Sequence, residues 1–120
     1  ADLAHLAAYC LSNPRFHAIV STYRTTIPLC GSQGTRVLIN HNRLLKQYDG
    51  AVGVKTGFTK HSGRCLVSAA ERDGVQLIAV TLNAPDDWND HTRMLDYGFS
   101  HYGITLRCLI TVSHVLPRCS

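Results

Sequence analysis

The sequence predicts an α+β fold, in which an antiparallel sheet carries helices on both of its faces. Helical periodicity occupies residues 1–20 and returns at residues 86–102, and strand-like segments fill the interval. One of these strands, residues 75–82, is apolar on both sides, which is typical of a sheet covered on both faces. We therefore expect one domain over residues 1–103 and assign no role to the tail, residues 104–120.

The chain is expected to open with two helices. The first is predicted by apolar residues at i, i+3, i+4, i+7 and i+8, which are Leu3, Leu6, Ala7, Cys10 and Leu11. This helix stops at Asn13-Pro14, and a second is expected over residues 14–20 because Pro14 suits a first turn. Since the first helix begins without a capping residue, we expect a longer chain to supply its N-cap.

Two short strands and a helical turn are expected next. Residues 23–29 and 36–40 alternate as strands do, and the glycine-containing turn at residues 31–34 lies between them. Residues 42–48 are expected to form a helical turn. This region therefore leads from the opening helices into the main sheet.

The main sheet and a closing helix account for the rest of the domain. Strands are expected over residues 52–59, 64–71 and 75–82, and Asp73-Gly74 is a strong signal for a tight turn between the last two. Asp86 and Asp87 favour the start of a helix, because acids are stabilised at its positive end. The apolar stripe of that helix is Trp88, Thr92, Leu95, Phe99 and Tyr102.

The composition of the chain disfavours several classes of function. The chain has 120 residues, 45% of them hydrophobic, so it can bury a core. Its net charge of +4 comes from scattered Lys and Arg, so we expect no nucleic acid partner. The cysteines lack C-x-x-C spacing and the histidines lack ligand spacing, so neither a metal site nor a cofactor is expected. No apolar stretch reaches the ~20 residues of a membrane span, and the chain contains neither a recognisable signal peptide nor an anchor.

Lys55-Thr56-Gly57 is the motif that carries functional information. Such a triplet accompanies Ser-x-x-Lys, which holds the nucleophile, and a Ser-x-Asn triplet in serine enzymes that act on D-alanyl peptides or β-lactams. Here no serine is followed by a lysine three residues on, or by an asparagine two residues on. The sequence therefore predicts one wall of such a site without its nucleophile, and we expect the chain alone to be inactive.

A series of short segments in the same order carries a family resemblance. These segments are residues 40–45, 48–50, 53–59, 63, 68–70, 77–80 and 96–99. From Ala1 to Tyr102 the chain resembles the C-terminal half of the catalytic domain of serine-type D-alanyl-D-alanine carboxypeptidases, low-molecular-mass penicillin-binding proteins of peptidase family S11. The resemblance implies that residues 1–103 belong to a β-lactamase/transpeptidase-like domain, with the nucleophile in an upstream half of that domain.

The resemblance also implies roles for the motif strand. Lys55 and Thr56 would bind the terminal carboxylate of the substrate, with Thr59 beside them, and Gly57 would let a peptide lie close to the strand. The backbone N–H of Phe58 would be one donor of the oxyanion hole. Since Lys55 and Thr56 point to opposite faces by strict alternation, we expect the site to run along the strand edge.

Two histidines close to these segments have different interpretations. His41 stands where some relatives have an arginine near the site, which makes it a candidate substrate-binding residue. His61 is interpreted as a surface loop residue beyond the motif. The expected partners are peptidoglycan stem peptides, β-lactams and the upstream half of the domain, and the expected location is the extracytoplasmic cell envelope of bacteria.

Three functions remain open at this point. The first is a fragment of a carboxypeptidase that trims the terminal D-alanine of stem peptides through an acyl-serine intermediate. The second is a fragment of a class A β-lactamase, which shares Lys-Thr-Gly, although Phe58-Thr59 and the Asn40-x-Asn42 segment fit the carboxypeptidase pattern better. The third is a non-catalytic remnant or a module that binds wall peptides.

Overall fold

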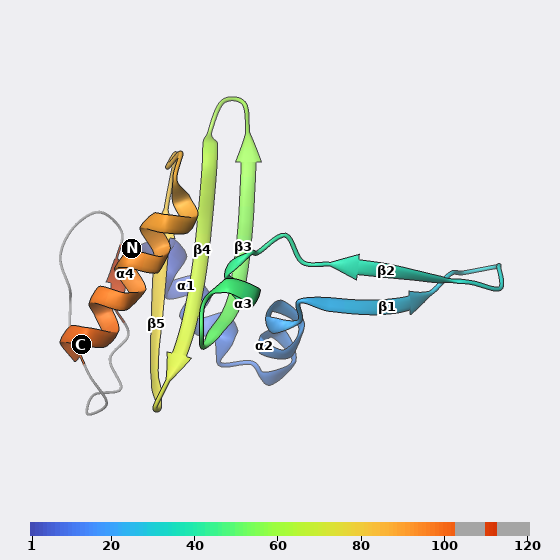
Figure 1. Ribbon diagram of the computed structural model, residues 1–120, viewed down its shortest axis with the longest axis horizontal. Helices are drawn as coiled ribbons and strands as arrows, with labels where there is room; N and C mark the ends of the chain where they lie inside the picture. The colour runs from blue at the N-terminus through green and yellow to red at the C-terminus, as the bar shows by residue number, and fades with distance from the viewer. Residues whose placement is uncertain (103–109, 113–120) are drawn as a thin grey trace.

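The computed structural model describes residues 1–102 and 110–112, and it shows a layered α+β arrangement (Figure 1). The elements in chain order are α1 (Asp2–Leu11), α2 (Pro14–Ser21), β1 (Arg24–Pro28), β2 (Thr35–Ile39), α3 (Leu44–Gln47), β3 (Ala51–Thr59), β4 (Gly63–Arg72), β5 (Val75–Thr81), α4 (Asp87–Tyr102) and β6 (Ile110–Val112). Each helix and strand predicted from periodicity is present, with boundaries that differ by one or two residues in most cases.

The main sheet has the strand order β3-β4-β5-β6. The first three strands pair antiparallel, as predicted, and the turn between β4 and β5 falls on Asp73-Gly74, both at positive φ. The fourth strand differs from the prediction, because β6 lies in the tail that received no role and pairs parallel with β5, with Leu77 opposite Ile110. The remainder of the tail lies outside the described residues.

Helices cover both faces of this sheet, as the apolar composition of residues 75–82 predicted. On one face, α3 and α4 bury a cluster of Leu44, Tyr48, Leu66, Ala70, Val75, Leu77, Ala79 and Leu95. On the other face, α1 packs a second cluster of Ala4, Ala7, Leu11, Ala69, Ile78 and Val80, with α2 residues at its border. Helix α4 approaches β5 very closely, because a Cβ added at Gly98 would lie 2.6 Å from Leu77 Cδ1. A side chain at that position would therefore require the Leu77 side chain to move.

Helix α1 does not pack on the sheet through the face that its large leucines predicted. Ala7 and Leu11 are buried as expected, but Ala4 joins them, while Leu3 and Leu6 are 43% and 58% exposed. The small alanines bring the helix backbone close to β5, and the larger leucines then project sideways. The helix ends as predicted: the Asn13 side chain accepts hydrogen bonds from the backbone N–H groups of Arg15 and Phe16, which caps α2.

Strands β1 and β2 form a separate two-stranded arm that projects from the body of the molecule (Figure 1). Every residue of both strands is exposed, including Ile27, Val37 and Ile39 at 41%, 44% and 56%. The sequence predicted the two strands and their turn correctly. It did not indicate that they stand apart from the main sheet.

A buried polar triad joins the sheet to α4. His91 is fully buried on α4, and its Nδ1 lies 2.5 Å from the Ser68 hydroxyl while its Nε2 lies 2.9 Å from the Thr81 hydroxyl. Because burial penalises the charged imidazolium, the pKa of His91 is lowered from 6.5 to about 4, against a smaller opposing effect of Asp87. The triad therefore holds a neutral histidine at neutral pH.

Candidate functional site

The motif strand β3 lies at an edge of the main sheet, since β4 is its only neighbour among the described strands. A groove of about 650 Å³ runs beside this edge. Its lining is His41, Arg43, Lys55, Thr56, Gly57, Phe58, Thr59, Arg64, Cys65, Asp87 and Trp88. All six residues singled out in the sequence as candidate site residues therefore line one groove beside the edge strand β3.

The alternation of β3 determines how the motif faces the groove. In the antiparallel register Lys55 lies opposite Val67 and Gly57 lies opposite Cys65. The Lys55 side chain is exposed, and its ammonium donates a hydrogen bond to the backbone carbonyl of Thr56, folding back along the strand. Phe58 is 71% exposed, so its ring does not belong to the core. The open edge of β3 therefore presents the Lys55 ammonium and an unobstructed stretch of backbone.

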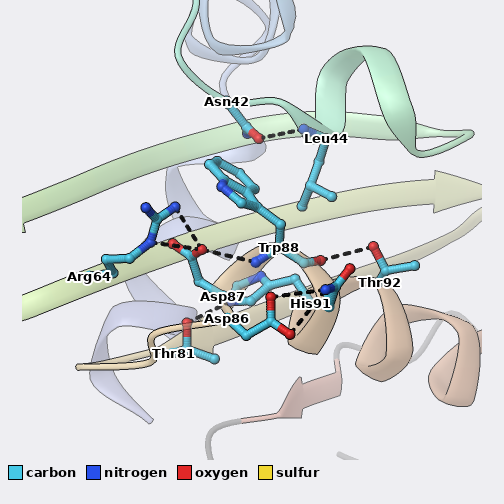
Figure 2. Close-up of polar contacts among 10 residues, drawn as sticks. Asn42, Leu44, Arg64, Thr81, Asp86, Asp87, Trp88, His91 and Thr92 are labelled. Atoms are coloured by element: carbon cyan, nitrogen blue, oxygen red, sulfur yellow. Dashed lines mark hydrogen bonds and ion pairs between the residues drawn. The ribbon is translucent and has the colours of Figure 1, made fainter.

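Residues at the start of β4 and at the start of α4 also line the groove, and Figure 2 shows the polar contacts among them. One Oδ of Asp87, which is only 4% exposed, accepts hydrogen bonds from Arg64 Nε at 3.1 Å and from the Trp88 backbone N–H at 3.0 Å. Arg64 Nη2 lies 2.9 Å from the same oxygen. The Arg64 guanidinium also lies 5.9 Å from the Trp88 ring centroid. Asp87 thus both supports the first turn of α4 and neutralises Arg64.

These three residues were not predicted to belong to the site. Asp87 was expected only to favour the start of the helix, and Trp88 only to belong to its apolar stripe. Trp88 does pack against the core, but it lines the groove as well. The strand register explains why Arg64 lies at the site, because Arg64 pairs with Phe58 across the hairpin of β3 and β4.

A short loop held by two asparagines also contributes to the lining of the groove. Asn40 Nδ2 donates to the carbonyl of Thr22 at 3.3 Å, and Asn40 Oδ1 accepts from the backbone N–H of Asn42 at 2.9 Å. Asn42 is 1% exposed, and its own Oδ1 accepts from the backbone N–H of Leu44 at 3.1 Å (Figure 2). These bonds fix the loop between β2 and α3, and they hold His41 and Arg43 at the groove.

Other features of the described residues bear on the function classes. His61 is exposed in the turn between β3 and β4 and does not line the groove, in agreement with its interpretation as a loop residue. Within residues 1–102 and 110–112, no group of three or more His, Cys, Asp or Glu side chains is placed to hold a metal ion. In the same part of the chain, no helix combines the length and the apolarity needed to cross a membrane.

A family model described as D-alanyl-D-alanine carboxypeptidase matches residues 1–86, which include the whole motif strand and most of the groove. The chain belongs to this family. The family resemblance inferred from the sequence is therefore confirmed, and a carboxypeptidase origin is favoured over a class A β-lactamase.

Individual D-alanyl-D-alanine carboxypeptidases show the same relationship. DacF of Bacillus subtilis is 44% identical over 68 residues, which are 54% of this chain and 18% of that protein. DacB2 of Mycobacterium tuberculosis is 29% identical over 105 residues, covering 82% of this chain and 35% of that protein. An enzyme of a Streptomyces strain is 33% identical over 105 residues, covering 82% and 36%.

Solved structures of family members have the same fold. The crystal structure of a Streptomyces DD-transpeptidase matches with a TM-score of 0.74 and 34% identity, over 82% of this chain and 40% of that chain. A D-alanyl-D-alanine carboxypeptidase of Mycobacterium tuberculosis matches with a TM-score of 0.65 and 28% identity, over 77% of this chain and 36% of that chain. The fold class is thus confirmed as that of the penicillin-binding DD-peptidases. The chain spans well under half the length of these relatives.

Proposed function

We propose that this chain is the substrate-binding wall of a serine D-alanyl-D-alanine carboxypeptidase, which removes the terminal D-alanine of peptidoglycan stem peptides through an acyl-serine intermediate. The observation that carries the proposal is the Lys55–Gly57 motif on the open edge of β3, facing a groove large enough for a peptide. No serine of the chain lies in a nucleophile motif. The nucleophile and its lysine are therefore supplied by residues outside 1–120 of the same protein.

Each residue of the motif strand has a role in this proposal. The Lys55 ammonium and the Thr56 hydroxyl bind the terminal carboxylate, and Thr59 extends the same polar edge. Gly57 presents no side chain, so an extended peptide lies against the backbone of β3. The Phe58 backbone N–H stabilises the oxyanion of the tetrahedral intermediate, where preorganised donors are most effective.

The surroundings of the motif adjust its electrostatics. Asp87 already neutralises Arg64, so the groove cations without an ion-pair partner among the described residues are Lys55 and Arg43. A net positive groove attracts an anionic carboxyl terminus and raises its local concentration. His41 adds a further polar contact at the loop. We place the protein in the extracytoplasmic cell envelope, where its proposed substrate lies.

Reaction with penicillin tests the proposal in the parent protein, meaning the complete product of the gene that contains this sequence. Benzylpenicillin should add one penicilloyl group to the parent protein, measured as an increase in intact mass. The 120-residue chain alone should gain no such mass. A parent protein without an adduct would support the interpretation as a non-catalytic remnant, and rapid loss of the adduct with fast penicillin turnover would support a β-lactamase.

A further inference from the structure

The arm formed by β1 and β2 has little to support it within the described part of the chain. Every residue of both strands is exposed, and the strands pair with each other but not with the main sheet. A two-stranded hairpin without a packing surface is at best marginally stable in water. We therefore expect another part of the complete protein to pack against the arm.

An apolar hollow lies at the base of the arm, where β1 and β2 meet the end of α2. It measures about 190 Å³ and is lined by Ile19, Thr22, Tyr23, Thr25, Leu38, Ile39 and Asn40. We call its four large hydrophobic side chains, Ile19, Tyr23, Leu38 and Ile39, the arm patch. They are 66%, 36%, 38% and 56% exposed, so none of them belongs to the core.

The composition of the hollow suits an apolar partner. The rest of its lining is Thr22, Thr25 and Asn40, so no charged side chain among the described residues lines it. Removing exposed aliphatic and aromatic side chains from water is favourable, whereas a charged ligand would find no counter-ion there. The arm patch is therefore expected to take an uncharged, apolar segment of protein.

The hollow is continuous with the motif groove. Between the two lies a cavity of about 420 Å³, which shares Tyr23 and Asn40 with the hollow and His41 and Arg43 with the groove. Asn40 ties this region to the end of α2, because its Nδ2 donates to the carbonyl of Thr22 at 3.3 Å. A partner that covers the groove can therefore reach the arm patch without a break in contact.

The direction of the arm indicates which partner this is. In Figure 1 the arm projects beyond the open edge of β3, on the side away from β4 and β5. A serine that reacts beside the Phe58 N–H has to reach that same edge, so the segment that carries it lies in the angle between β3 and the arm. This chain covers 40% of a Streptomyces DD-transpeptidase chain, so most of that relative lies outside the match.

We propose that the arm patch docks the part of the same polypeptide, outside residues 1–120, that carries the nucleophile, through an apolar segment of that part. The proposal rests on the proposed function, which places the nucleophile outside this chain. The arm is then a second contact, beside the edge of β3, that fixes the nucleophile relative to Lys55 and the Phe58 N–H.

Two tyrosines provide a matched comparison in the parent protein. Hydroxyl-radical oxidation, read by peptide mass spectrometry, gives the rate at Tyr23 and Tyr97 in the folded parent relative to the same residue in the unfolded parent. Tyr97 lies on α4, outside the arm patch, and is 55% exposed, so it should keep about half of its unfolded rate. Tyr23 should fall below about one-twentieth, because fully buried side chains are more than ~95% inaccessible. A relative rate near one-third, as its exposure of 36% gives without a partner, would overturn the proposal.

A charged substitution tests the consequence for the site. Ile39→Glu should slow penicillin acylation of the parent roughly tenfold or more, because an unpaired carboxylate at the docking surface displaces the segment that carries the nucleophile. The same change should leave the urea midpoint of the 120-residue chain unaltered, since Ile39 is exposed there. Tyr97→Glu should leave the acylation rate of the parent unaltered. An Ile39→Glu parent that is acylated at the unmodified rate would contradict the docking role, and the tyrosine comparison decides the case where this variant does not fold.

The remaining outcomes separate the possible failures. Acylation of the unmodified parent together with an accessible Tyr23 refutes only the docking surface, whereas a parent that is not acylated refutes the proposed function itself. Protection of Tyr23 that appears only as the parent concentration rises, together with a dimer in sedimentation, means that a second copy covers the patch and the proposal is wrong.

Discussion

Protonation of His91 should make the fold sensitive to mild acid. Folding moves this imidazole from water to a site between Ser68 and Thr81, where its pKa falls from 6.5 to about 4. Between these two values the unfolded chain binds a proton and the folded chain does not. Stability from this group is therefore present above pH 6.5 and is lost as the pH falls toward 4.

The expected size of the effect follows from the pKa difference. Each unit corresponds to 1.36 kcal/mol, so the shift of His91 is worth roughly 3 kcal/mol over this pH range. That amount is a large fraction of the free energy of unfolding of a typical domain. Because other groups also titrate in acid, the His91 contribution has to be isolated by comparison with a variant.

Urea unfolding of the chain, followed through the fluorescence of its single Trp88, measures this contribution. His91→Gln keeps a donor and an acceptor but cannot gain a charge. The difference in unfolding free energy between the unmodified chain and His91→Gln should fall by roughly 3 kcal/mol from pH 6.5 to pH 4. A flat difference for His91→Gln, or an NMR titration midpoint of His91 near 6.5, would refute the reasoning.

Three other expectations concern the site and the surface. Lys55→Ala should slow penicillin acylation of the parent protein at least tenfold with an almost unchanged Tm, since a charge-assisted hydrogen bond of about 1.5–3 kcal/mol is lost. His61→Ala should change neither the acylation rate nor the Tm. Equal acylation rates for Lys55→Ala and the parent would contradict the active-site assignment. Asp87→Ala should lower the urea unfolding free energy by about 1.5–3 kcal/mol, because the hydrogen bonds that its buried carboxylate accepts from the Trp88 N–H and from Arg64 are lost. Arg64→Gln should cost less than about 1 kcal/mol because that side chain is 42% exposed, and the reverse order would contradict this cause. The chain alone should self-associate in sedimentation measurements through exposed apolar residues such as Leu6, and Leu6→Lys should reduce the association; a chain that stays monomeric at high concentration would contradict the prediction.

The elements of the fold could be predicted because their signals are local. Pro14 and Asn13 mark the start of α2 through a fixed φ and a capping side chain, and Asp73-Gly74 supplies the positive φ values of a tight turn. Such signals depend on a few neighbouring residues and do not need the partner element. Hydrophobic period alone also predicted that both faces of the sheet are covered, since β5 is apolar on both sides.

The arrangement of some elements could not be predicted in the same way. The arm formed by β1 and β2 has the alternation of any strand pair, and nothing in that alternation says whether the pair joins the main sheet. The parallel pairing of β6 with β5 connects segments about thirty residues apart, with Leu77 opposite Ile110. Similarly, the side of α1 that packs was decided by close approach at Ala4 and Ala7, which a count of the larger apolar residues misses.

The site shows the same division between local and non-local information. The motif on β3 is contiguous in sequence, so its residues could be named together, and all of them line the groove. Arg64 and Asp87 meet only because β4 folds back along β3 and α4 starts beside it. Their pairing removes one positive charge from a groove that would otherwise hold three of them.

This neutralisation gives the remaining cations distinct positions. Lys55 lies on the strand edge, and Arg43 lies on the loop between β2 and α3. Both positions favour the anionic carboxyl terminus of the proposed substrate, because a net positive groove raises the local concentration of such a ligand.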